Sequence, residues 1–170
     1  MLRIAPVLLL FPVSVVAQSW TQLPNFPGTA RDDAAAFNIG QFIYVGTGMQ
    51  VGWGLTNDWW RYDVYGIEWQ QIASLPTTPR QYCTAIGSGD KGYLFGGVDS
   101  NGVLNELWEY DPVQDQWTQL PSLPANPRYA CAGWQNGSSI YIATGMMDTG
   151  MPTNEFWEFE RISQTWDQLD

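Results

Sequence analysis

Apolar and polar residues alternate along most of the chain in short runs that end at turn-forming residues. In the middle third such runs fall near 81–87, 92–97, 105–111 and 115–120, with turns at 88–92 and 111–115 between them. Two-residue alternation bounded by turn residues predicts half-buried β-strands. No stretch after residue 17 keeps the period of about 3.6 residues of an amphipathic helix. The pattern therefore predicts an all-β fold.

The same succession of strands recurs three times. A Trp-x-Gln-apolar motif opens at Trp20, Trp69, Trp117 and Trp166, with spacings of 49, 48 and 49 residues. Between motifs come an Arg, an aromatic-aliphatic strand ending in Gly, and a strand of the form Asn-acid-apolar-Trp. Tandem units of this length with four strands each are typical of β-propeller blades.

On these residues the chain resembles the kelch-repeat family. The resemblance covers residues 19 to 170. Its marks are a Gly-Gly pair after an apolar strand, Tyr-Asp pairs, and a Trp six or seven residues beyond each pair: Gly96-Gly97; Tyr62-Asp63 and Tyr110-Asp111; Trp69, Trp117 and Trp166. The departures are Thr47-Gly48 and Thr144-Gly145 for the double Gly, and Phe159-Glu160 for Tyr-Asp.

The resemblance implies a kelch-type propeller with blades at about 31–72, 80–120 and 128–169 and an orphan outer strand at 19–23. Propellers close with about four to eight blades, so three blades leave two apolar faces open. Two interpretations remain. The chain is part of a six- or seven-bladed ring whose remaining blades lie elsewhere, or a second copy of the chain closes one ring.

The first 17 residues are unlike the repeats. Arg3 precedes an apolar run from Ile4 to Val16, and Val15-Val16-Ala17 has the small residues of a cleavage site. This pattern predicts a secretory signal peptide over residues 1–17, cleaved after Ala17, because the run is too short to span a bilayer. We therefore expect a secreted or periplasmic protein.

The net charge and the amino-acid composition limit the kinds of partner that we expect. Seven basic and 17 acidic residues give a net charge of −10, and the chain has no His. Such a chain repels nucleic acid and anionic membrane surfaces, and it carries no second hydrophobic segment for membrane insertion. Without His we expect no metal site, no cofactor and no activated nucleophile in this segment.

Cys83 and Cys131 occupy equivalent positions, 48 residues apart, in neighbouring repeats. Export would permit a disulfide between them. Equivalent positions on adjacent blades should lie about 8–10 Å apart, however, beyond the limit of about 7 Å between Cα atoms. The sequence therefore leaves open whether the two cysteines form a disulfide or remain free thiols.

The loops between the second and third strands are where the repeats diverge: 49–56, 98–104 and 146–153. By resemblance, these loops rim the central channel and bind partners. Trp53, between Gly52 and Gly54, has no counterpart and suits stacking on a sugar or an aromatic partner, unless it folds back over its own blade. With it, the candidate ligand-binding residues of these loops are Gln50, Asp99, Asn101 and Asp148.

The repeat arginines Arg31, Arg80 and Arg128 are further ligand-binding candidates, because the resemblance implies that arginines at this position contact acidic ligands. Their recurrence in every repeat also fits structural ion pairs with the equally periodic acids Asp58, Glu106 and Glu155.

These observations predict an exported, non-catalytic kelch propeller segment that binds a protein or glycan through its 2–3 loop face. The alternative is the N-terminal part of a propeller enzyme, resembling a sialic acid epimerase or galactose oxidase, with catalytic residues beyond residue 170. An enzyme resembling galactose oxidase needs His ligands for its copper ion, and this segment contains no His.

Overall fold

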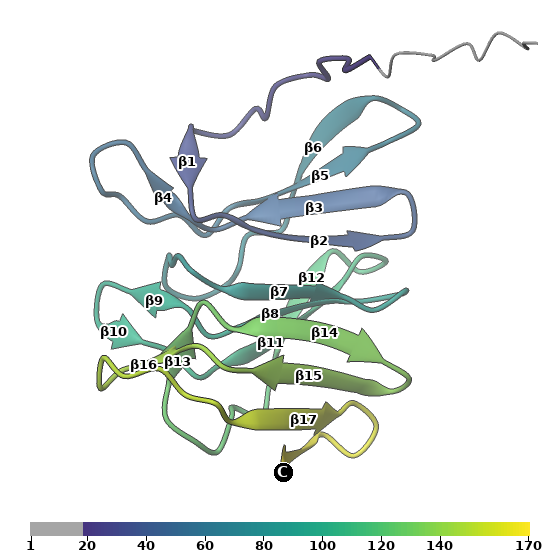
Figure 1. The fold of residues 1–170 in the computed structure, drawn as a ribbon. Helices are drawn as coiled ribbons and strands as arrows, with labels where there is room; N and C mark the ends of the chain where they lie inside the picture. Colours follow the sequence, from purple (N-terminus) through teal and green to yellow (C-terminus); the bar gives the residue numbers. More distant parts are fainter. Residues whose placement is uncertain (1–18) are drawn as a thin grey trace, which may run out of the picture.

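The computed structural model describes residues 19–170, so the predicted signal peptide at 1–17 lies outside the described residues. Three four-stranded antiparallel sheets are stacked face to face (Figure 1). The first contains β2 (Ala35–Ile39), β3 (Phe42–Gly46), β5 (Trp59–Asp63) and β6 (Glu68–Ile72), hydrogen-bonded in that order. The second contains β7 (Thr84–Gly87), β8 (Gly92–Phe95), β11 (Leu107–Asp111) and β12 (Gln116–Leu120). The third contains β14 (Ala132–Asn136), β15 (Ser139–Ala143), β17 (Phe156–Glu160) and β18 (Thr165–Leu169).

The strands follow the alternation in the sequence. In β2, Ala35, Phe37 and Ile39 are buried, while Ala36 and Asn38 between them are exposed. Successive side chains of a strand point to opposite faces, so this pattern directs one face of the blade into the core. No helix in residues 19–170 is long and apolar enough to cross a membrane.

The outer hairpin has the same register in each blade. Tyr62 pairs with Trp69, Tyr110 with Trp117, and Phe159 with Trp166, and each pair has its ring centroids 5.0 Å apart. The indole N–H of each outer Trp donates to a carbonyl of the segment that precedes its blade: Trp69 to Pro24 at 3.2 Å, Trp117 to Ala73 at 3.0 Å, and Trp166 to Pro121 at 2.8 Å. The recurring tryptophans thus build the blades and join them.

Adjacent blades share continuous apolar cores. Phe37 and Trp59 of the first blade lie against Trp117 of the second, with centroids 6.5 Å and 5.0 Å from its ring. Between the second and third blades the buried cluster is mainly aliphatic and includes Ile86, Leu107, Ile140 and Ile142. Both interfaces bury the same repeat positions with different side chains.

Side-chain volume is complementary across each sheet. Gly46 pairs with Trp59, and a Cβ on Gly46 would lie within 2.5 Å of that indole. The equivalent pairs are Phe95 with Leu107 and Ala143 with Phe156. A glycine in the first blade therefore makes room for its larger ring.

The third blade ends the stack with an uncovered aromatic face. Trp134 is 42% exposed and stacks on Tyr141 and Phe156, at centroid distances of 5.8 and 5.6 Å. The equivalent residues Phe37 and Ile86 are buried by the next blade. A closed propeller needs further blades against such a face.

Residues 19–23 form no strand with the described residues, and Trp20 is fully exposed. A strand requires a hydrogen-bonded neighbour, and none of the described residues supplies one here. The chain joins the first blade at Phe26, whose ring packs edge-on against Trp60 and Trp69 at 5.9 and 5.3 Å.

Short two-stranded ribbons lie along one edge of the stack, on the left in Figure 1. They pair β1 (Arg31–Asp32) with β4 (Met49–Gln50), β9 (Val98–Asp99) with β10 (Gly102–Val103), and β13 (Arg128–Tyr129) with β16 (Met146–Met147). The ribbons contain the three variable loops, so the candidate residues gather at this edge.

Candidate functional site

Trp53 stands at the tip of the first variable loop. The Gln50 N–H donates to the Gly54 carbonyl at 2.8 Å, and the Trp53 N–H donates to the Gln50 carbonyl at 3.1 Å. Gly52 and Trp53 both have positive φ, 89° and 68°. These left-handed conformations belong to the tight turn at the loop tip and resemble those of other turns in the chain, such as Ile67 and Tyr82. The side chain is 82% exposed, so it does not fold back over its blade.

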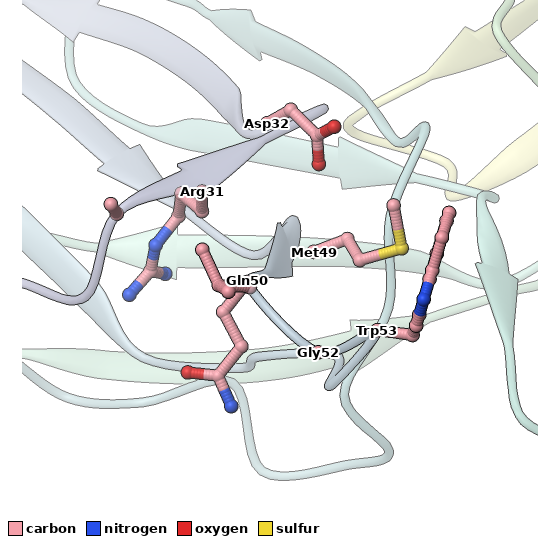
Figure 2. A pocket seen from close by; sticks show the side chains of 8 residues that line it. Arg31, Asp32, Met49, Gln50, Gly52 and Trp53 are labelled. Atoms are coloured by element: carbon pink, nitrogen blue, oxygen red, sulfur yellow. The ribbon is translucent and has the colours of Figure 1, made fainter.

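A pocket of about 310 Å³ lies beside this loop (Figure 2). It brings together three candidates from the sequence, Arg31, Gln50 and Trp53, with Asp32 and Met49. Antiparallel pairing of β1 with β4 places Arg31 opposite Gln50 and Asp32 opposite Met49. In Figure 2, Trp53 and the Arg31 guanidinium lie on opposite sides of the view, with Met49 between them. We call this hollow the Trp53 pocket.

Arg31 is held by a dense set of acceptors. Its Nη1 donates to Asp58 Oδ1 at 2.6 Å and to Thr56 Oγ1 at 2.8 Å, and its Nη2 donates to Asp58 Oδ2 at 2.9 Å. Burial opposes ionisation of Asp58, but hydrogen bonds from Arg31 and the Trp60 indole outweigh it and lower the pKa of the carboxyl. The Arg31 guanidinium is therefore already engaged in a structural ion pair with Asp58.

Arg80 and Arg128 form the equivalent pairs with longer acids. Their Nη2 atoms donate to Glu106 Oε2 at 2.7 Å and Glu155 Oε2 at 2.6 Å. Both arginine side chains are fully buried, and the Nη1 atom of each lacks a hydrogen-bond partner among the described residues. The ion-pair interpretation of the repeat arginines thus matches all three blades, and in these two the cation has no surface to offer a ligand.

The second variable loop folds around Asp99. This carboxylate is buried and accepts hydrogen bonds from the Thr78 hydroxyl and from the backbone N–H groups of Asn101 and Gly102, at 2.7, 2.7 and 2.9 Å. Burial favours the neutral acid, but these hydrogen bonds together lower its pKa. Asp99 therefore stabilises its own turn. Asn101 is exposed at the tip of this turn.

Asp148 lies on the third variable loop and is exposed. Its N–H donates to the Pro127 carbonyl at 3.2 Å, which ties the loop to the segment before β13. It does not line the Trp53 pocket, and neither does Asp99 or Asn101. The eight candidates therefore divide among three repeats, and only Arg31, Gln50 and Trp53 line one pocket.

Sequence reasoning missed Asp32 and Met49, which only the β1–β4 pairing brings to the pocket. It also missed an aromatic pair on the same edge, Tyr82 and Tyr129, with centroids 5.7 Å apart. A hydrogen bond to the Asp33 carboxylate raises the pKa of Tyr82. Asp32, Tyr82 and Tyr129 differ from their counterparts in the other repeats, which could have indicated them, whereas Met49 has the apolar counterparts Val98 and Met146 and gave no such signal.

Cys83 and Cys131 are free thiols, so the structure contains no disulfide between them. Burial raises the pKa of Cys83 to about 12 and that of Cys131 to about 11. A neutral thiol is a poor nucleophile and a poor metal ligand. Within residues 19–170 no group of three or more His, Cys, Asp or Glu side chains is arranged to hold a metal ion.

Stacked four-stranded sheets with variable loops at one edge define the blades of a β-propeller. A family model, the KLHDC2/KLHL20/DRC7 Kelch-repeats domain, matches residues 8–170, and the chain therefore belongs to the kelch-repeat family.

Two of the known proteins that are similar to the chain illustrate the relationship. N-acetylneuraminate epimerase 1 of Escherichia coli O6:H1 is 35% identical over 86 residues, which make up 48% of this chain and 22% of that protein. The structure of YjhT superposes with a TM-score of 0.77 at 21% identity, over 89% of this chain and 55% of that one. The chain thus spans about half of that structure, and the likeness to it shows the fold alone.

Proposed function

We propose that the chain is the segment of an exported kelch propeller that binds a protein or glycan ligand, without catalysis, through its 2–3 loop face. Membership of the kelch family supports a binding role but does not identify the ligand. Export is proposed from the leader-like residues 1–17.

One observation carries the proposal: the exposed Trp53 beside a pocket on the variable edge. The exposed indole leaves a large apolar surface in contact with water. A bound ligand would cover this surface, which favours binding. The recurring tryptophans have packing roles in the blades, whereas Trp53 makes no aromatic stacking contact with any described residue.

Trp53→Ala tests this proposal in binding assays on glycan and peptide arrays. We expect the variant to lose a ligand that the unaltered protein retains. Tyr65→Ala is the matched control, because Tyr65 is an equally exposed aromatic on the turn between β5 and β6. Equal binding by the unaltered protein and both variants would refute the proposal.

A second candidate is favoured by the similarity to N-acetylneuraminate epimerase 1. In this case the chain is the first part of a propeller enzyme acting on a sialic acid, with catalytic residues beyond residue 170. The matched region covers 22% of that relative, so its activity carries over only as a proposal.

Epimerisation of N-acetylneuraminate, followed by NMR, separates the two candidates when the longest form of the protein encoded by its gene is assayed. Acceleration over the uncatalysed reaction would support the enzyme. No acceleration, together with ligand binding that depends on Trp53, would support the binding module.

A further inference from the structure

We infer that the Trp53 pocket binds a basic side chain, Lys or Arg, presented by an exposed segment of a partner protein. The inference rests on the proposed binding function and names its ligand class. Its basis is the combination of an exposed indole, an uncommitted carboxylate and a guanidinium that is already engaged in the same pocket.

The pocket offers no cation to an acidic ligand. Arg31, its one basic lining residue, is bound by both oxygens of Asp58 and also packs over the Phe26 ring at 5.0 Å. The other basic side chains of residues 19–170 are engaged as well: Arg80, Lys91, Arg128 and Arg161 in ion pairs, and Arg61 over the Phe42 ring. An anionic ligand would therefore have to displace a short, charge-assisted pair.

Asp32 supplies the opposite charge. It is exposed, it lines the pocket, and its carboxylate accepts no hydrogen bond from any residue in the described part of the chain. Figure 2 shows its oxygens on the same side of the Arg31 guanidinium as Met49 and Trp53. A carboxylate and an indole that line the same pocket are suited to a bound ammonium or guanidinium group, because the ring and the anion both attract the cation.

The apolar lining fits the rest of such a side chain. Met49 and the exposed Val51 flank the pocket beside Trp53. The methylene stem of Lys or Arg would lie along this surface while its head reaches Trp53 and Asp32. A volume of about 310 Å³ is small among ligand pockets, which span roughly 300–1,000 Å³, so it suits one side chain better than an oligosaccharide.

The net negative charge of the chain also favours a basic ligand. All 17 acidic residues lie after residue 17, and the net charge is −10. A field of this sign attracts basic segments of a partner and accelerates their association, more strongly at low salt.

The test uses a fluorescent, end-capped peptide, Gly-Ser-Arg-Leu-Ser-Gly, and the same peptide with citrulline in place of arginine. Citrulline keeps the shape of the side chain and removes its charge. Anisotropy at about 20 and 150 mM NaCl gives the affinities and their salt dependence. We expect the citrulline peptide to bind about threefold more weakly or worse, and Trp53→Ala to weaken the arginine peptide by about tenfold.

Asp32→Asn should weaken the arginine peptide about two- to fivefold. Asp167→Asn is the matched control, since it removes the same charge from an exposed residue on β18, outside the pocket. Equal effects of the two substitutions would overturn the inference, because only the overall field would then matter.

The outcomes separate this inference from the proposed function. If both peptides bind equally and depend on Trp53, or if a neutral or sialylated glycan binds at Trp53 and the arginine peptide does not, the inference fails and the binding module stands. If neither peptide nor any glycan depends on Trp53, both fail.

Discussion

Trp53 and Trp59 lie six residues apart and have opposite environments. Trp59 is 0% exposed, between Phe37 and Trp117, whereas Trp53 is 82% exposed on the loop before it. Position 59 recurs in each repeat as an apolar residue, with Leu107 and Phe156 as its counterparts, and position 53 has no counterpart. The repeated region builds the interface between blades, and the loop that interrupts it offers a surface to a ligand.

The largest expected effect is on stability, at the blade interface. Trp59→Ala should lower the free energy of unfolding by about 3–5 kcal/mol, because it empties the space between two blades. Trp59→Phe, which installs the residue of the third blade, should be much milder. Urea unfolding followed by circular dichroism measures both, and a loss below about 1 kcal/mol for the alanine variant would contradict the described packing.

A smaller effect tests how the first blade accommodates this indole. Gly46→Ala should destabilise the protein by about 1–3 kcal/mol, since the added methyl would overlap the Trp59 ring. The double variant Gly46→Ala with Trp59→Phe reproduces the pair Ala143 and Phe156 of the third blade. It should recover part of the loss in a double-mutant cycle, and additive losses would show that the two positions do not compete for space.

The repeated ion pairs predict a dependence of stability on pH. The pKa of Glu155 is lowered, chiefly by its hydrogen bond from Arg128 and then by that from the Trp157 indole. A carboxyl with a folded-state pKa below its unfolded-state value of about 4.5 stabilises the fold above that value and loses this stabilisation as pH falls through the folded-state pKa.

Unfolding free energies measured from about pH 6 down to pH 3 should therefore decline, and Glu155→Gln should make the decline shallower. Glu158→Gln, on β17, provides a comparison, because the Glu158 carboxylate accepts a hydrogen bond from the Tyr141 hydroxyl and forms no ion pair with an arginine of the described residues. An unchanged slope in Glu155→Gln would show that the pair does not contribute.

The smallest expected effect on stability is at the loop. Trp53→Ala should change the free energy of unfolding by no more than about 0.5 kcal/mol, because the side chain is already in water. The same variant should weaken binding of the arginine peptide by about tenfold, so the two measurements together separate the loop from the interface. A loss as large as that of Trp59→Ala would place Trp53 in the folded core instead.

Much of the fold could be predicted from local pattern. The alternation and the repeat predicted an all-β propeller, the resemblance implied the kelch type, and the family match and the stacked sheets confirm both. The pairing of Arg31, Arg80 and Arg128 with Asp58, Glu106 and Glu155 followed from their common period. The strand at 19–23 stays a prediction, because it would pair with blades that the described residues do not include.

The candidate site was less predictable. Trp53 could be identified because no other repeat has a Trp there, and Gln50 and Arg31 accompany it in the pocket. Asp99 belongs to an equally variable loop, yet its carboxylate is buried in a turn. The sequence shows which positions vary and does not show which way their side chains point.

The sequence by itself determined the repeat unit, its strands and the positions that every blade needs, because these depend on alternation and on contacts that recur at a fixed spacing. Only the tertiary structure decided that Asp32 meets Met49 and Trp53 at one pocket, and that the Asp32 carboxylate has no partner among the described residues there. These features arise from pairing between segments about 18 residues apart, whose geometry is set by the packed blade and not by either segment alone.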